Sequence, residues 1–400
     1  MPAYTYTAKN KNGNSVDGIL DAKSDMEVSE ILHKQDLTVI SIKLSKNKFI
    51  KTKAVQVKLD DLVIFSRQLA TMIEAGISLV QCLGILSEQI ENKGLKSVVT
   101  IIRQDIEGGM SFCDALAKHP GVFSELFVSM TKAGETSGML DEVLDRLAGY
   151  LEKSAALNRK IRSSLVYPAV VVTIAVAITF FLLIKVVPTF KNIFETLGGK
   201  LPTPTLILIG ISNLVKKWFL VFIIVLIVFA VILKKYINTK KGRYRFDKFK
   251  LNVIILGELF RKVALAKFAR TFSTLIKSGV SVLSSLEIVA TTSGNKVIEE
   301  TIMKCRESVR EGETMYQPLS RGKVFPPMVT RMISVGEQTG QLEKMLSKIA
   351  DFYDEQVDSA VAGLTSLIEP MVIVFLGFVV GGIVVALFLP IFKITELIAK

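Results

Sequence analysis

The chain has 400 residues, of which half are hydrophobic, and it carries a formal net charge of +13 at pH 7. Its mean hydropathy of +0.44 is high for a soluble globular protein. Nucleic-acid binding is disfavoured, because neither an aromatic-interleaved basic patch nor a zinc-ligand spacing accompanies the charge. The composition favours a membrane protein whose cations lie beside anionic lipid headgroups.

Residues 1–50 are predicted to form a small α/β domain. The segments 4–8 and 37–44 alternate in polarity as strands do, and a helical stretch lies between them. The N-terminus has no apolar core of the kind found in a cleavable signal, so we expect no such signal.

Six helices are predicted between residues 58 and 165. Apolar residues recur at helical spacing, and glycines or prolines separate the helices. Gly76, followed by Ser78, predicts a tight turn between the first two helices. No breaker follows the start of the sixth helix until Pro168, so this helix is expected to continue into a membrane span.

Three apolar segments are predicted to span a membrane: 166–188, 216–235 and 368–392. A helix rises about 1.5 Å per residue and the bilayer core is about 30 Å thick, so the two outer segments are long enough alone. The middle one is short unless the apolar residues at 206–214 extend it. Residues 189–215 are predicted to form an external loop.

The orientation follows from the lysines and arginines beside these spans. Fourteen of them lie in 151–165 and 234–262, against six in 188–217 and 393–400. The richer flanks are expected to be cytoplasmic. We therefore predict a multi-pass protein of the cytoplasmic (inner) membrane with a cytoplasmic N-terminus.

The first helical block and its span occur twice. Residues 65–80 read FSRQLATMIEAGISLV and 268–283 read FARTFSTLIKSGVSVL, a shift of 203. The sequence VFSELFVSMTKAGETSGML at 122–140 recurs as VFPPMVTRMISVGEQTGQL at 324–342, a shift of 202. This is a duplicated unit, and it predicts a second six-helix block at 261–364. The fold class is therefore an all-α membrane protein with two repeated six-helix cytoplasmic bundles, three transmembrane helices and the small α/β domain.

Positions that recur in both copies are predicted to be structural or to contact a partner. They are Arg67, Gly76, Gly134, Glu135, Gly138 and Leu140, with Arg270, Gly279, Gly336, Glu337, Gly340 and Leu342 as counterparts. Membrane-helix packing is predicted for the recurring prolines and for a small-residue pair in the last span. These residues are Pro168, Pro370, Gly377 and Gly381.

The most distinctive local sequence is GETSG at 134–138, with its copy GEQTG at 336–340. Its glycines are expected to supply a positive φ at a turn between helices. Glu135 and Glu337 are expected to cap the following helix or to contact a partner. A catalytic carboxylate is disfavoured because no histidine lies nearby in either copy.

No catalytic residue, cofactor or metal ligand is predicted. The sequence lacks GxxxxGK[ST], GxGxxG after a strand and GxSxG, so any ATP that the process needs is hydrolysed by another protein. Its cysteines, Cys82, Cys113 and Cys305, are not in CxxC spacing and are expected to be buried and reduced.

The repeated motifs, with spans after each block, make the chain resemble the type II secretion F / type IV pilus platform family over nearly its whole length. The resemblance implies a non-enzymatic inner-membrane platform for pilus or pseudopilus assembly. It implies binding of a cytoplasmic assembly ATPase, and of a retraction ATPase where one exists, and transfer of its motion to pilins or pseudopilins. Inner-membrane alignment proteins, membrane lipids and a second copy in a homodimer are the other expected partners.

Two alternatives remain open from the residues alone. Three spans and Lys185 would suit a transporter or channel subunit, although the spans contain few other polar residues. A membrane enzyme could use Glu135 or Glu337. The sequence leaves a type IV pilus, a competence pilus and a type II secretion system equally open.

Overall fold

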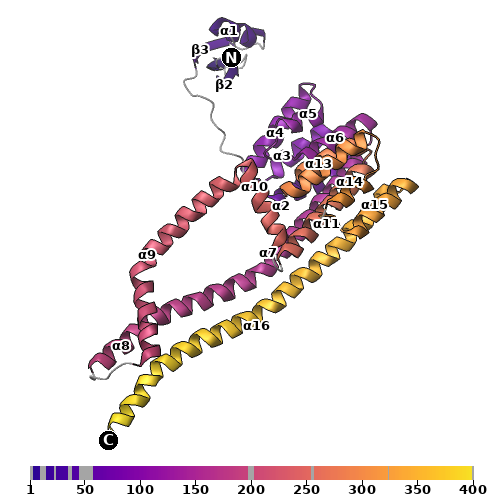
Figure 1. The fold of residues 1–400 in the computed structure, drawn as a ribbon. Coiled ribbons are helices and arrows are strands. Elements are labelled where there is room, and N and C mark those ends of the chain that lie inside the picture. Colours follow the sequence, from indigo (N-terminus) through magenta and orange to yellow (C-terminus); the bar gives the residue numbers. More distant parts are fainter. Residues whose placement is uncertain are drawn as a thin grey trace. The chain divides into compact units, whose positions relative to one another are not determined.

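The computed structural model describes residues 3–9, 15–21, 24–34, 38–44, 57–196, 202–253, 256–322 and 324–398. It divides into two compact units, Met1–Gln56 and Val57–Lys400 (Figure 1).

The small unit is an antiparallel three-stranded sheet with one helix. Its elements are β1 (Ala3–Lys9), β2 (Ser15–Asp21), α1 (Asp25–Lys34) and β3 (Thr38–Leu44), and the strand order is β2-β1-β3. Tyr4 of β1 is buried with Val28 and Leu32 of α1, and Val39 and Ile42 of β3 pack against them. The two predicted strands and the helix between them are confirmed, and β2 is an additional strand.

The first helical block contains the six predicted helices. They are α2 (Leu59–Glu74), α3 (Leu79–Gln89), α4 (Lys93–Glu107), α5 (Phe112–Ala117), α6 (Glu125–Ser137) and α7 (Leu140–Phe181). Phe65, Phe123 and Phe127 pack in the core with their rings tilted or edge-on to one another, at centroid distances of 6.0 and 4.8 Å along the series. Gly76 has φ +82°, a conformation that favours glycine, in the turn between α2 and α3.

The second helical block repeats this arrangement. Its helices are α11 (Leu256–Lys277), α12 (Val282–Thr292), α13 (Lys296–Arg310), α14 (Tyr316–Arg321), α15 (Pro327–Thr339) and α16 (Leu342–Ile398). Phe268 and Phe325, which correspond to Phe65 and Phe123, are 4.9 Å apart. Gly279 has φ +79°. The two six-helix bundles are therefore confirmed, and α10 (Lys240–Asn252) packs on α11 and α13 beside them.

Two helices connect the blocks to the apolar segments without a break (Figure 1). The first is α7, which passes through Pro168 and continues as the π-helical turn η1 (Leu182–Val186) and as α8 (Val187–Thr196). The second is α16, which is 57 residues long. The prediction that the sixth helix runs into the first span is confirmed.

Two helical segments, Leu140–Asn192 and Leu342–Leu389, are long and apolar enough to cross a membrane. The helix α9 (Thr203–Ile237) bends by 57° between Thr203–Phe219 and Val221–Ile237. If its two parts are taken together as one span, the chain has three.

The segment 189–215, predicted as a loop, is largely helical. It contains most of α8 and the start of α9, which begins at Thr203 instead of near 216. Packing explains the difference, because Leu208 and Ile209 contact a cluster that includes Val187 and Ile383. This buried contact stabilises the helix, and the apolar residues at 206–214 do extend the middle segment.

The glycines of the last span have open surroundings. A Cβ added at Gly377 or Gly381 would meet no atom of the described chain within 4 Å. No helix of this part of the chain packs closely on them, and their role in helix packing stays a prediction, as does that of Pro168 and Pro370.

Candidate functional site between the two helical blocks

The recurring arginines form matching ion-pair clusters. Arg67 of α2 donates from Nε and Nη2 to both carboxylate oxygens of Glu152 on α7, at 2.6 and 2.8 Å, and from Nη1 to Asp145 at 2.6 Å. These hydrogen bonds raise the pKa of Arg67, first through Glu152 and then through Asp145. The bond from Arg67 also lowers the pKa of the Glu152 carboxyl. The cluster therefore ties α2 to α7.

Arg270 does the same for α11 and α16. It donates to Asp351 at 3.1 Å and also to Asp354, which is the repeat counterpart of Glu152. Its side chain is 14% exposed, whereas that of Arg67 is 38% exposed. Both copies therefore contain the same ion-pair cluster between two helices, and the arginine of the second copy is the more buried.

The GETSG segment is mostly helical, which corrects the predicted loop. Residues 134–137 form the last turn of α6, and only Gly138 is left-handed, with φ +71°; Gly340 matches it with φ +70°. Gly134 and Gly336 do not have a positive φ. An added Cβ at Gly134 would lie 3.1 Å from Val143 Cβ and 3.2 Å from the Leu140 Cα. Glycine is needed there because the next helix crosses closely.

Glu135 and Glu337 cap the preceding short helix, not the following one as predicted. The two Glu135 oxygens accept from the backbone N–H groups of Phe112 and Cys113 at 2.6 and 2.9 Å, at the start of α5. Glu337 accepts from the N–H of Met315 at 3.1 and 3.2 Å, at the start of α14. A carboxylate is favoured at a helix N-terminus, where N–H groups lack partners within the helix.

Glu135→Gln should destabilise the protein by about 1–3 kcal/mol, because the amide keeps one acceptor oxygen and places an NH₂ beside a backbone N–H. Glu337→Gln should cost less, since it caps through one N–H group. The measurement is the thermal unfolding midpoint of the purified full chain in detergent. Glu88→Gln, at an exposed position on α3, is the control and should change nothing. Equal midpoints for Glu135→Gln and the control would show that the cap contributes no stability.

The three cysteines are buried and free, as predicted. Burial, with the nearby charge of Glu337 as a lesser cause, raises the pKa of Cys305 to about 12. A thiol with so high a pKa is unreactive at neutral pH. The described residues contain no group of three histidines, cysteines or carboxylates that could hold a metal ion.

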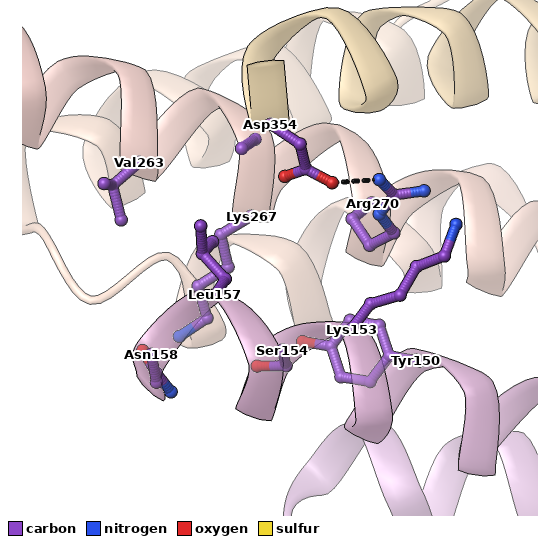
Figure 2. Close-up of a pocket in the computed structure, with 10 residues that line it drawn as sticks. Tyr150, Lys153, Ser154, Leu157, Asn158, Val263, Lys267, Arg270 and Asp354 are labelled. Carbon is purple, nitrogen blue, oxygen red and sulfur yellow. Dashed lines mark hydrogen bonds and ion pairs between the residues drawn. The ribbon is translucent and has the colours of Figure 1, made fainter. Parts of the chain in front are cut away.

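Where the two blocks meet, α7, α11 and α16 enclose a cavity (Figure 2). The blocks are joined nearby by a hydrogen bond of 3.1 Å between the hydroxyls of Tyr150 and Thr271 and by one from Arg146 to the carbonyl of Lys277. Lys153, Lys267, Arg270 and Asp354 line the cavity. Of the residues predicted from the sequence, only Arg270 lies there; Arg67 lines an adjacent hollow with Lys153 and Arg270.

Sequence reasoning missed Lys153 and Lys267. Aligning the two copies of the repeat would have drawn attention to Lys267, because it occupies the position that Ile64 has in the first copy. A cation replaces an apolar residue inside an otherwise repeated helix. Glu135 and Glu337 lie on α6 and α15, and neither they nor the repeated glycines line this cavity.

Comparison with known proteins gives a consistent result. The family model of type II secretion system (T2SS) protein F matches residues 65–188 and again 268–390, and the model of its N-terminal domain matches 1–43. Among relatives, the type IV pilus assembly protein PilC of Thermus thermophilus is 42% identical over 400 residues, covering 98% of each chain. PilC of Myxococcus xanthus is 40% identical over 398 residues, covering 98% of this chain and 94% of the relative.

Type II secretion system protein F of Vibrio cholerae is 30% identical over 406 residues and is covered completely, as is this chain. Both copies of the repeat and the small N-terminal unit thus fall within matched regions. The resemblance inferred from the repeated motifs is confirmed, and the chain belongs to the type II secretion system protein F family.

Proposed function

We propose that this chain is the inner-membrane platform on which a type IV pilus is assembled. The observation that carries the proposal is the duplicated six-helix block, each copy continuing into a membrane-length helix, in a chain that belongs to this family. The two pilus assembly relatives are 40–42% identical, against 30% for the secretion relative, which favours a pilus over a secretion system.

The platform couples a cytoplasmic assembly ATPase to pilins that leave the membrane. Support comes from α7 and α16, which join each block to its span as one helix. No loop interrupts either helix, so a displacement of the block is carried to the span along the helix backbone. In this arrangement the N-terminus and both blocks are cytoplasmic, and the ATPase binds there.

Exposed apolar residues along the second half of α9 form a surface that other molecules in the membrane can cover. Nearly every described side chain in Val221–Ile237 is exposed. This surface suits lipid or a second copy in a homodimer. A transporter is less well supported, because the groove between the spans is lined entirely by apolar side chains, among them Ala175, Met371 and Phe375.

The test is an insertion that interrupts the helix between block and span. Gly-Gly-Ser-Gly placed between Ser163 and Ser164 of α7 should abolish surface pili while the assembly ATPase still copurifies with the protein. A strain lacking the gene should likewise have no pili and retain pilin in its membrane. Ser163→Ala with Ser164→Ala is the matched control and should support normal piliation.

Normal piliation of the deletion strain would remove the platform proposal. Normal piliation with the insertion alone would remove only the rigid coupling, because the platform could then act without a continuous helix.

A further inference from the structure

The cavity between the helical blocks has an excess of positive charge. It has a volume of about 80 Å³ and takes its lining from α7 of the first copy and from α11 and α16 of the second. Figure 2 shows Lys153, Lys267 and Arg270 around it, with Asp354 paired to Arg270. Its lining therefore holds three cations and one carboxylate.

That carboxylate is already engaged. Asp354 is bonded to Arg270, which also binds Asp351 on the same helix. Lys153 and Lys267 form no ion pair with any residue that the structure describes. The cavity therefore lacks counter-charges for two lysines.

Lys267 is the more unusual of the two. It lies between Ala266 and Phe268, both buried, and burial lowers the pKa of its ammonium group. Holding a charged ammonium in a largely buried position without a counter-ion is unfavourable, because burial removes its hydration. An anion entering the cavity would offset that penalty.

The rest of the lining supplies hydrogen-bonding groups. Tyr150, Ser154 and Asn158 of α7 face the cavity beside the cations (Figure 2). Cations combined with hydroxyl and amide donors are the groups that bind phosphate oxygens. The volume holds a few waters or one tetrahedral oxyanion.

The two lysines of the cavity are not shared between the copies of the repeat. Lys267 corresponds to Ile64 in the first copy, and Lys153 corresponds to Glu355 in the second. The two lysines are thus specific to the surface where the copies meet.

We propose that this cavity binds a phosphate group, which contacts Lys267 of the second block and lies beside Lys153 of the first (Figure 2). The phosphate belongs to a soluble phosphate ester or to a lipid headgroup, which share this chemistry. Lys153 precedes the apolar residues that begin at 166 by roughly 20 Å of helix, a distance that favours a soluble source. The inference does not depend on the platform function.

The experiment measures the thermal unfolding midpoint of the full chain, purified in detergent and Tris buffer, during titration with inorganic phosphate. Sodium chloride of equal ionic strength is the reference. The wild type should gain stability from phosphate beyond the chloride effect. Lys267→Met should lose that gain, and Lys153→Met should lose most of it.

Two features keep the result interpretable. Lys304→Met, at an exposed lysine of α13 away from the cavity, should respond as the wild type does. Lys267→Met should be folded and at least as stable as the wild type in phosphate-free buffer, because it removes a buried charge. If it does not fold, Lys153→Met provides the same test.

The source is separated by reconstituting the protein in phosphatidylglycerol or phosphatidylcholine vesicles without free phosphate. If phosphatidylglycerol stabilises the protein and the effect depends on Lys267, the phosphate belongs to a lipid. If phosphatidylglycerol has no effect but inorganic phosphate does, the phosphate belongs to a soluble ester. No phosphate or lipid response beyond that of chloride, or an undiminished response in Lys267→Met, overturns the proposal.

Discussion

Gly336→Val is expected to destabilise the protein by about 2–3 kcal/mol, because no space exists for a side chain at this position. An added Cβ would lie 2.9 Å from the Leu342 Cα and 3.1 Å from Met345 Cγ. The first of these atoms is backbone at the start of α16, so the clash is relieved only if α15 and α16 separate. Gly134→Val should act in the same direction but less strongly, since its closest contacts, with Val143 and Leu140, begin at 3.1 Å.

The matched control is Gly363→Val in α16, the helix that Gly336 of α15 packs against. Gly363 is exposed, and an added Cβ there meets nothing within 4 Å. Valine is a slightly better helix former than glycine, so this variant should be neutral or slightly stabilised. Thermal unfolding midpoints of the three full-length variants in detergent provide the comparison. Equal midpoints for Gly336→Val and Gly363→Val would show that the crossing of α15 and α16 does not require glycine.

The sequence predicted a positive φ at these glycines, and the prediction is right for Gly138 and Gly340 but wrong for Gly134 and Gly336. A positive φ and a close helix crossing both select glycine, and a single sequence does not distinguish the two causes. Gly138 and Gly340 satisfy the first, whereas Gly134 and Gly336 satisfy the second. The difference depends on contacts with the following helix, which only the folded arrangement supplies.

The helices themselves could be predicted because their signals are local. Apolar spacing, turn glycines and the repeat gave all six helices in each block and the continuation of the sixth into a span. Partners far apart in the sequence could not be predicted. Glu135 caps a helix 22–23 residues before it, and Arg67 binds Glu152, 85 residues away.

The lysine cavity belongs to the same class of long-range features. Lys153 and Lys267 come from different copies of the repeat and share one cavity only because the copies pack against each other. Aligning the copies marks Lys267 as a departure from Ile64, yet it does not reveal what lies opposite. Repeat comparison identifies the position, and the packing of the blocks identifies its surroundings.

The two repeated arginines, Arg67 and Arg270, allow the effect of burial on the strength of an ion pair to be compared within one chain. Arg270→Met should cost about 1–2 kcal/mol, because it leaves Asp351 and Asp354 without the cation that they share, and that cation is only 14% exposed. Arg67→Met removes as many ion pairs from a more exposed site and should cost about 1 kcal/mol. Water can solvate Asp145 and Glu152 once Arg67 is gone, whereas the carboxylates around Arg270 have less access to it.

Arg331→Met is the control for this pair, because Arg331 is exposed on α15 and should be replaceable without loss. The measurement is again the unfolding midpoint of the full chain, taken at low and at high salt. Salt should weaken the Arg67 cluster more than the Arg270 cluster, so the difference between the two variants should widen as salt is added. If Arg67→Met costs as much as Arg270→Met under both conditions, burial does not set the strength of the repeated ion pair.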